Sequence, residues 1–193
     1  ILRERVSETG MALIYVNMVG GQDELVFDGA SFALDRGGKV ACQLPSFEES
    51  LEFVTVVNGE PQRSEVVPEE SLESEVYRAL CLGVHDYIGK NGFPGALIGL
   101  SGGVDSALTL CIACDALGPE RVRAVMMPSQ YTSEASLEDS RELVRNLGVR
   151  YVEIPIRPAF DAFLGSLAGE FAGLPSDATE ENLQARIRGT LLM

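Results

Sequence analysis

Long hydrophobic runs and basic residues are both scarce in this sequence of 193 residues. No apolar run reaches the roughly 18 to 20 residues that span a bilayer, and the amino-terminal stretch ILRERVSETG lacks the apolar core of a signal peptide. The 15 Lys and Arg residues against 29 Asp and Glu give a formal net charge of −14, which argues against binding along a nucleic-acid backbone. We therefore expect no membrane and no nucleic acid as a partner. The hydrophobic content of 46% still predicts a globular protein with a buried core.

Cysteine and histidine are also few. Cys42, Cys81, Cys111 and Cys114 are too few and too irregularly spaced for a disulfide framework, which favours a reducing compartment and hence the cytoplasm. The last two form a C-x-x-C pair, but no second pair or nearby histidine completes a zinc site, so we interpret the spacing as a helix face turned toward the core. His85 is the only histidine, and no nucleophile lies beside it in the sequence. A histidine-dependent mechanism is therefore disfavoured.

The first 58 residues carry strand-like runs separated by turn signals. The runs are MALIYVNMV, ELVFDGASFAL and LEFVTVV, and the glycines of DRGGK, residues 35–39, are typical of a hairpin. ALIYV, residues 12–16, is nearly continuous in apolar residues, as in a strand covered on both faces. The preceding ILRERVSE indicates the end of a helix. Because the chain starts at Ile1 and stops at Met193 within a helical pattern, we expect a piece of a longer protein.

Residues 59–75 predict an interdomain linker, because they hold two prolines and a surplus of acidic residues with little to bury. Beyond them the apolar spacing becomes helical. The run VYRALCLGVHDYIGKNG, which starts at residue 76, places Val76, Leu80, Val84 and Tyr87 on one helix face and ends in glycines.

Residues 95–193 alternate short apolar runs with helical patterns. The predicted strands are GALIGL, RVRAVMM and RYVEIPI, and the predicted helices cover residues 104–117, 134–147, 158–171 and 179 onward. This alternation predicts right-handed crossovers and an α/β fold with a parallel, doubly wound sheet that carries helices on both faces. Ligands of such sheets bind at the carboxyl ends of the strands.

The most informative motif is LSGGVDS, residues 100–106, which follows the first of these strands and runs into a helix. Gly102 and Gly103 allow a tight turn and a close approach to a ligand, and the helix amino terminus offers free N–H groups. Ser101 and Ser106 add hydroxyl donors. The combination predicts an anion site whose natural ligand is a phosphate chain. It is neither a Walker A loop, which needs a lysine, nor a G-x-G-x-x-G dinucleotide fingerprint.

Asp105 lies among these phosphate donors, where alone it would repel the ligand. Its presence is consistent with a Mg²⁺ ion that bridges the phosphates, because a carboxylate oxygen suits that metal. The alternative is a glycine-rich turn in which Asp105 only caps the helix.

SGGVDS after a strand resembles the PP-loop of the ATP pyrophosphatases, which cleave ATP between the α and β phosphates. Within that superfamily, GLSGGVDSAL, VRAVMMPSQYTSEASLEDSRELVRNLGV and EENLQARIRG resemble the glutamine-dependent NAD synthetase family in order and approximate spacing. YVNMVGGQDELVFDGASF resembles the end of the nitrilase-like glutaminase domain that precedes the synthetase domain in that family. The resemblance implies an adenine nucleotide α-hydrolase-like PP-loop domain at residues 76–193. It also implies that residues 1–58 are the last strands of a nitrilase-like α/β sandwich.

The function implied by the resemblance is that of a ligase. It would amidate deamido-NAD to NAD through an adenylated intermediate, with ATP and Mg²⁺, with ammonia from glutamine, and with AMP and pyrophosphate as products. We expect such an enzyme to be a homo-oligomer. The family's glutaminase cysteine lies upstream of YVNMV, Cys42 does not match it, and the family's synthetase domain continues past ENLQARIRG, so this chain alone is expected to be inactive.

Three alternatives to this function stay open. Another PP-loop enzyme could thiolate tRNA, although the charge of −14 disfavours that partner, or it could be a different amidotransferase-type ligase. A third possibility is a non-catalytic fragment that only binds a nucleotide.

Site residues follow from the same resemblance, which assigns no catalytic residue to this chain. The expected ATP-binding residues are Gly99, Leu100, Ser101, Gly102, Gly103, Val104, Asp105 and Ser106, with Asp105 also on the metal. Asn182 and Arg186, four residues apart on one helix face, are expected to contact deamido-NAD. A solvated helix face is the alternative, particularly for Arg188.

The segment MMPSQYTS, residues 126–133, follows the second strand of the predicted sheet. It could flank the adenosine, or it could simply connect the strand to a helix that Ser133 or Ser136 caps. Asp177 or Thr179 is expected to cap the last helix.

Overall fold

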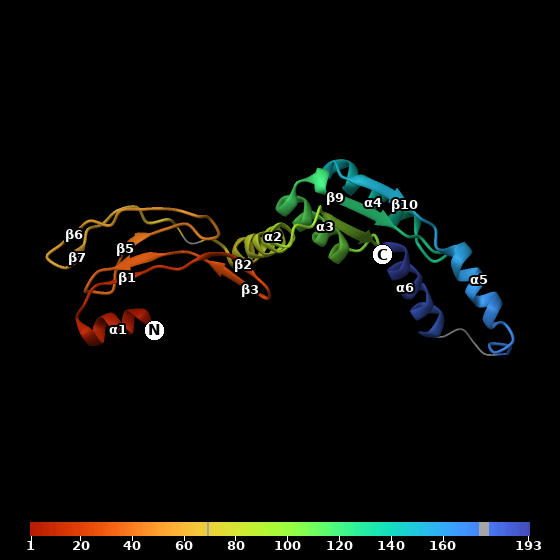
Figure 1. Ribbon diagram of the computed structural model, residues 1–193, viewed down its shortest axis with the longest axis horizontal. Coiled ribbons are helices and arrows are strands. Elements are labelled where there is room, and N and C mark those ends of the chain that lie inside the picture. The colour runs from red at the N-terminus through yellow and green to blue at the C-terminus, as the bar shows by residue number, and fades with distance from the viewer. Residues whose placement is uncertain (69, 174–177) are drawn as a thin grey trace. The chain divides into compact units, whose positions relative to one another are not determined.

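The structure, a computed structural model, describes residues 1–68, 70–173 and 178–193 (Figure 1). These residues divide into two units, Ile1–Gly92 and Phe93–Met193. Within the described ranges, no helix combines the length and the apolar character that crossing a membrane requires.

The first unit consists of a short helix, small antiparallel sheets and one long helix. Helix α1 (Leu2–Thr9) confirms the predicted helix end, because Gly10 has a φ of 65° and its N–H donates to the Val6 carbonyl oxygen. The strands are β1 (Leu13–Tyr15), β2 (Val19–Gln22), β3 (Leu25–Asp28), β4 (Phe32–Leu34), β5 (Val40–Gln43), β6 (Val56–Val57) and β7 (Glu60–Pro61). They form the sheets β1-β4-β5, β2-β3 and β6-β7. A small core forms around Ala33, Ala41 and Cys42.

The strands of this unit are shorter than the sequence runs predict. MALIYVNMV splits into β1 and the start of β2, because Asn17 leaves the ladder: its side-chain amide donates to Asp28 Oδ1 (2.8 Å) and its N–H donates to Ser31 Oγ (3.0 Å). ELVFDGASFAL is broken where Gly29 and Ala30 have φ values of 72° and 45°. Strand β5 was not predicted, whereas LEFVTVV forms a strand only at its last two residues.

The DRGGK hairpin is confirmed, since β4 pairs with β5 and the N–H of Lys39 donates to Asp35 Oδ1 (2.9 Å). The prediction that ALIYV is covered on both faces is wrong for the described residues. Ile14 and Val16 are 54% and 79% exposed, because no described element covers these side chains and the core of the unit lies on β4 and β5 instead.

Helix α2 (Leu72–Lys90) begins inside the predicted linker, and not at residue 76, because Ser71 caps it. The Ser71 hydroxyl accepts a hydrogen bond from the N–H of Ser74 (3.3 Å). The predicted apolar face is not the packed face, since Val76, Leu80 and Tyr87 are about half exposed.

The packed face of α2 carries Gly83, Asp86 and Lys90, which meet strand β2. Asp86 Oδ2 accepts a hydrogen bond from the N–H of Gly21 (2.7 Å) and pairs with Lys90 Nζ (2.9 Å), and Lys90 donates to the Gly21 carbonyl oxygen (2.6 Å). Burial raises the pKa of Asp86, but hydrogen bonds from Lys90, Gly21 and His85 outweigh it and hold that pKa below its usual value. The spacing of the apolar residues therefore predicted the wrong packed face of α2, because polar contacts of Asp86 and Lys90 hold this helix against β2.

The second unit has the predicted alternation of strands and helices. Its elements are β8 (Ala96–Leu100), α3 (Val104–Leu117), the 3₁₀ turn η1 (Pro119–Arg121), β9 (Val122–Met126), α4 (Glu134–Leu147), β10 (Arg150–Glu153), α5 (Arg157–Leu167) and α6 (Ala178–Leu192). The predicted strands and helices are confirmed to within a few residues, with α5 ending earlier than expected. All strands run parallel, in the order β10-β9-β8.

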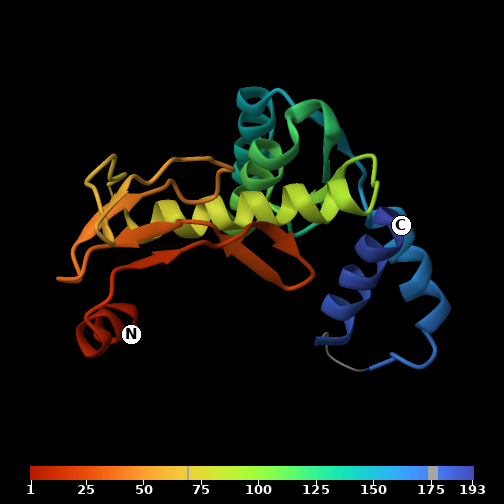
Figure 2. The ribbon, with the colours of Figure 1, turned by 60° about the vertical axis from the view of Figure 1, so that its left-hand side comes forward.

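Helices lie on both faces of this sheet, which confirms the predicted fold class. Helices α3 and α4 contact each other and strand β9. Val125 of β9 faces the other way and packs with Ile187 of α6 and Phe160 of α5, because neighbouring strand residues alternate in direction. Helices α5 and α6 lie side by side (Figures 1 and 2). The carboxyl end of the sheet is therefore bordered by α6.

An ion pair ties α4 to β10. Arg141 donates to both carboxylate oxygens of Glu153, from Nε at 2.7 Å and from a terminal nitrogen at 3.0 Å, and the Tyr151 hydroxyl donates to the same carboxylate (3.0 Å). The hydrogen bonds from Arg141 lower the pKa of Glu153. Burial, together with the hydrogen bond to Glu153, raises the pKa of Tyr151 to about 12. This network fixes the helix that borders the LSGGVDS loop.

Candidate functional site

The LSGGVDS loop turns sharply between β8 and α3, as predicted. The Ser101 N–H donates to Ser106 Oγ (3.2 Å), the Gly103 N–H donates to Ser101 Oγ (3.3 Å), and the Ser106 hydroxyl donates to the Gly103 carbonyl oxygen (2.9 Å). The serine side chains therefore hold the loop in shape, in addition to the role of hydroxyl donors that the sequence predicts for them. The first N–H groups of α3 have no acceptor within the helix and point out of its amino terminus.

Gly102 is required by the packing of the loop. Its φ is 80°, and a Cβ atom built on it would lie 2.4 Å from the Cβ of Ser136 and 2.7 Å from the Cα of Ser136. Gly103 differs, because its φ is −92° and the nearest atom to an added Cβ is Ser101 Oγ at 3.4 Å. The missing side chain of Gly102 thus allows the loop to pack closely against helix α4. The missing side chain of Gly103 leaves room on the open side of the loop.

Asp105 is not the residue that caps α3. The N-cap position is Gly103, which has no side chain to cap with, and Asp105 lies in the first turn of the helix. Its side chain is exposed and makes no hydrogen bond or ion pair with the described residues, while its carbonyl oxygen accepts a hydrogen bond from the Thr109 hydroxyl (2.8 Å). The Asp105 carboxylate therefore does not help to hold the loop in shape.

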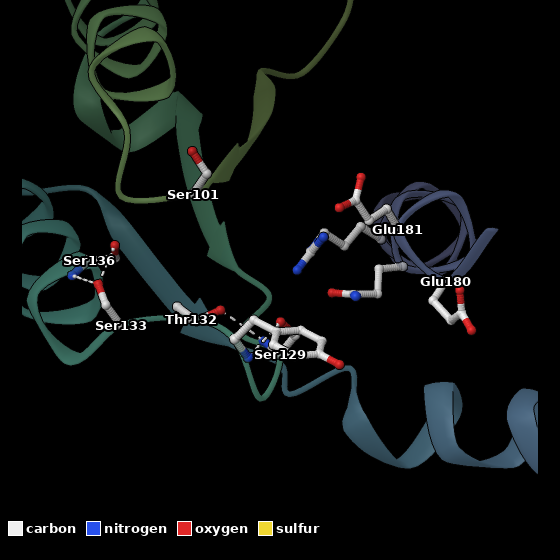
Figure 3. Close-up of a pocket in the computed structure, with 10 residues that line it drawn as sticks. Ser101, Ser129, Thr132, Ser133, Ser136, Glu180 and Glu181 are labelled. Carbon is white, nitrogen blue, oxygen red and sulfur yellow. Dashed lines mark hydrogen bonds between the residues drawn. The ribbon is translucent and has the colours of Figure 1, made fainter. Parts of the chain in front are cut away.

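A cavity of about 640 Å³ opens at the carboxyl ends of β8 and β9 (Figure 3). Its lining is polar and consists of Ser101, Ser129, Tyr131, Thr132, Ser133, Ser136, Glu180, Glu181, Gln184 and Arg188. Figure 3 shows Ser101 on one side and Glu180 and Glu181 of α6 on the other, with Ser129 and Thr132 on the loop after β9. We call this space the polar cavity.

A second cavity of about 470 Å³ adjoins the polar cavity. It is lined by Gly99, Leu100, Ser101, Met126, Met127, Thr132, Ala185, Arg188, Gly189 and Leu192, most of which are apolar or lack a side chain. We call it the apolar cavity. The two cavities share Ser101, Thr132 and Arg188, so these residues stand at the boundary between them.

The remaining loop residues lie outside these two cavities. Gly102, Gly103 and Ser106 line a smaller space of about 140 Å³ between α3 and α4, and Val104 and Asp105 are exposed. Of the predicted ATP-binding residues, the structure therefore brings Gly99, Leu100 and Ser101 into the larger cavities.

Helix α6 turns toward the cavity a face that does not carry Asn182 and Arg186. Glu181, Gln184 and Arg188 line the polar cavity. Asn182 and Arg186 are exposed and line neither larger cavity, because they lie about 100° and 140° around the helix from Glu181. The predicted pair does share a face, and its contact with deamido-NAD stays a prediction.

Helix capping and the cavity lining coincide in the segment after β9. Ser133 caps α4, since its hydroxyl accepts a hydrogen bond from the N–H of Ser136 (3.1 Å), and both serines also line the polar cavity. The two readings of MMPSQYTS are therefore compatible. The predicted cap Asp177 lies outside the described residues.

The charges of the polar cavity do not suffice to hold a phosphate chain alone. Arg188 is the single basic residue among its lining residues, against the two carboxylates of Glu180 and Glu181. Among the described residues there is no group of three or more His, Cys, Asp and Glu side chains that could hold a metal. A cation at this site would be held by few protein ligands together with phosphate oxygens, as is typical of Mg²⁺, and the role of Asp105 as one of those ligands stays a prediction.

The cysteines and the histidine take no part in this site. Cys114 is buried, and its burial, with smaller effects of Cys111 and Asp115, raises its thiol pKa to about 11, which leaves it unreactive. His85 is exposed on α2, with its Nδ1 3.1 Å from Asp86 Oδ1. The interpretation of the C-x-x-C pair as part of a core-facing helix is consistent with this burial.

Comparisons with known proteins identify the second half of the chain. The family model described as NAD synthase matches residues 76–193. The glutamine-dependent NAD(+) synthetase of Acinetobacter baylyi is 46% identical over 194 residues, which cover 100% of this chain and 36% of that protein. The enzyme of the same name from Rhodobacter capsulatus is 48% identical over 194 residues, which cover 98% of this chain and 35% of that protein.

A solved structure is similar over the whole chain. The structure of the glutamine-dependent NAD+ synthetase from Acinetobacter baumannii in complex with adenosine diphosphate matches 100% of this chain with a TM-score of 0.96 and 46% identity. The match covers 37% of that protein. The chain thus spans little more than a third of the length of the relatives that it matches.

Proposed function

Because the chain belongs to the NAD synthase family, we propose that its second unit binds ATP at the carboxyl ends of β8 and β9. In the full-length protein this site would serve the ATP-dependent amidation of deamido-NAD to NAD, with ammonia taken from glutamine. The protein would then be a glutamine-dependent carbon–nitrogen ligase.

The observation that carries this proposal is the path of the chain from β8 through Ser101, Gly102 and Gly103 into α3. It directs the amino terminus of a helix toward the end of the sheet, where the dipole and the free N–H groups favour a phosphate group. The polar and apolar cavities adjoin this point and differ in character, as the phosphates and the base of a nucleotide do. The adenosine diphosphate in the Acinetobacter baumannii relative supports the same ligand class.

The proposed reaction has two steps. In the first, a carboxylate oxygen of deamido-NAD attacks the α phosphorus of ATP, a carbon–oxygen–phosphorus link forms, and pyrophosphate leaves with the electron pair of the broken bond. In the second, ammonia attacks the activated acyl carbon, AMP leaves with the electron pair of the acyl–oxygen bond, and the nitrogen loses a proton. The loop after β8 would stabilise the charge that grows on pyrophosphate.

Magnesium is part of the proposal, with Asp105 as its ligand from this chain. The ion would neutralise phosphate charge in a site whose lining carries two carboxylates and a single arginine. Asp105 is suitable because its carboxylate is exposed in the first turn of α3.

We further propose that Asn182 and Arg186 contact deamido-NAD from the exposed face of α6. Residues 1–58 would then be the end of the glutaminase domain, residues 59–75 a linker, and residues 76–193 the first part of the synthetase domain. The four free cysteines are consistent with a reducing compartment, for which we propose the cytoplasm. We also propose a homo-oligomeric assembly.

A pyrophosphate-release assay on the full-length protein tests this function. With ATP and Mg²⁺, release of pyrophosphate should require deamido-NAD, and NAD should form only when glutamine or ammonia is added. A protein that binds ATP and releases no pyrophosphate under any of these conditions would be a nucleotide-binding module without this activity. Release that is independent of deamido-NAD would point to another acceptor.

A further inference from the structure

Arg188 occupies the boundary between the polar and the apolar cavity. It lines both spaces, together with Ser101 of the loop and Thr132 of the segment after β9. Its Nε donates a hydrogen bond to the carbonyl oxygen of Met127 (3.1 Å), which anchors the guanidinium at the end of β9. The residue is half-buried.

The guanidinium keeps most of its donor capacity. Arginine carries five N–H donors, and the bond to Met127 is the one hydrogen bond of this side chain that the described part of the chain provides. Arg188 is also the single basic residue among the residues that line the two cavities, with Glu180 and Glu181 as the acidic ones. The planar guanidinium group can donate two parallel hydrogen bonds to the oxygens of a phosphate group.

We propose that Arg188 binds the α phosphate of ATP and stabilises the charge on that phosphate when it is attacked. This inference rests on the proposed function. The α phosphate is the first charged group after the base and the ribose, so a nucleotide whose base enters the apolar cavity would place it at the boundary where Arg188 lies. The amino terminus of α3 is then left for the β and γ phosphates.

The anchor on Met127 determines how the site would work. Because Nε is held by the strand end, the two terminal nitrogens are fixed in direction and do not need to be ordered when the nucleotide binds. A lysine at this position would retain the positive charge, but it would lose the paired terminal N–H donors and the hydrogen bond from Nε to Met127. Arg188 would therefore be a residue that touches substrate, in contrast to one that only holds α6 on the sheet.

The test compares AMP with adenosine, since AMP carries only the α phosphate and adenosine carries none. Binding of AMP, adenosine and ATP is measured by calorimetry on the full-length protein, its Arg188→Gln and Arg188→Lys variants, and an Arg157→Gln control. Arg157 lies at the start of α5 and lines neither cavity, and among the described residues its side chain forms only an exposed ion pair with Asp161. The native protein should prefer AMP to adenosine, and Arg188→Gln should weaken AMP binding by about tenfold or more. Adenosine affinity should stay within about threefold.

Other outcomes overturn the assignment. Equal weakening of AMP and adenosine would mean that Arg188 only positions α6. A loss seen with ATP but not with AMP would place its contact on the β or γ phosphate, and unchanged binding of all three would remove it from the site. If Arg188→Gln does not fold, Arg188→Lys should still show a reduced preference for AMP. If the native protein binds neither ATP nor AMP, the proposed function fails as well, so the two failures are distinguishable.

Discussion

Gly102 and Ser136 lie so close together that a Cβ atom on Gly102 would be 2.4 Å from the Cβ of Ser136. The contact joins the loop after β8 to the first turn of α4, which Ser133 caps from the end of the β9 loop. Two segments that border the cavity are thereby held against each other at a single glycine. The shape of the proposed phosphate site depends on this packing.

Replacing Gly102 with alanine should therefore unfold the loop locally and destabilise the protein. A φ of 80° is unfavourable for alanine, and the added methyl group would overlap Ser136, so we expect a loss of about 2 to 5 kcal/mol. Chemical denaturation measures that loss, and calorimetry should show that ATP binding is lost as well.

Gly103→Ala is the matched control for this change. Its φ is negative and an added Cβ meets only Ser101 Oγ at 3.4 Å, so the stability should change by less than about 1 kcal/mol while ATP binding weakens. Ser136→Gly should not rescue Gly102→Ala, because the Cα and carbonyl oxygen of residue 136 lie 2.7 and 2.9 Å from the added Cβ. Rescue by that second change would contradict the packing account.

Asp105→Asn in the full-length protein should abolish NAD formation and leave glutamine hydrolysis measurable. The side chain is exposed and does not cap α3, so the melting temperature should not change. Loss of a ligand to Mg²⁺ should reduce turnover by at least about 100-fold. The decisive comparison is a magnesium titration of both proteins, and equal NAD formation at limiting magnesium would show that Asp105 holds no metal.

Asn182→Ala should raise the KM for deamido-NAD more than the KM for ATP. Asn182 is exposed and lines neither larger cavity, so its loss should spare the ATP site and the fold. Removal of a side-chain amide that leaves its hydrogen-bond partner unpaired should raise the KM for deamido-NAD by about tenfold or more. Steady-state kinetics with each substrate varied in turn measures the difference. Equal increases in both constants would indicate a displaced helix, and no increase in either would leave Asn182 a surface residue.

The second unit could be predicted well from the sequence because its signals are local. Apolar runs that alternate with helical periods fix the strands and helices, and the order along the chain fixes a parallel sheet. The turn at residues 101–103 could be predicted for the same reason, since two glycines stand directly between a strand pattern and a helical pattern.

The face of α6 could not be predicted, because it depends on contacts far away in the sequence. Ile187 packs against Val125 of β9, and this long-range contact turns Glu181, Gln184 and Arg188 toward the cavity. Their spacing of three and four residues was visible in the sequence, whereas the motif resemblance drew attention to Asn182 and Arg186, whose contact with deamido-NAD stays a prediction.

The first unit was harder to predict for a related reason. Its strand breaks depend on residues with positive φ, such as Ala30, and on side-chain bonds such as that of Asn17 to Asp28, neither of which alters the apolar pattern. Helix α2 shows the same limit, because the polar contacts of Asp86 and Lys90 fix its packed face.

The ion pair between Glu153 and Arg141 should make stability depend on pH. The folded-state pKa of Glu153 lies below its usual value of 4.5, so the paired carboxylate stabilises the fold above that pH and the stabilisation is lost as the pH falls through the folded-state pKa. Glu153→Gln should therefore be less stable than the native protein at pH 7, and the difference should shrink at acidic pH.

Urea denaturation at several pH values measures this dependence. Glu134→Gln is the control, because Glu134 meets the same arginine at 3.5 Å with a side chain that is 74% exposed, and such a pair contributes little. A difference between Glu153→Gln and the native protein that stays constant down to acidic pH would contradict the assignment.

We propose that the full-length protein activates deamido-NAD by attack of its carboxylate on the α phosphorus of ATP bound at this site. The most direct test uses deamido-NAD labelled with ¹⁸O in that carboxylate, followed by mass spectrometry of the products after turnover with ATP, Mg²⁺ and ammonia. Attack on the α phosphorus should leave one labelled oxygen in AMP and no label in pyrophosphate. Label in pyrophosphate or phosphate, or NAD formation without transfer of label to AMP, would contradict it.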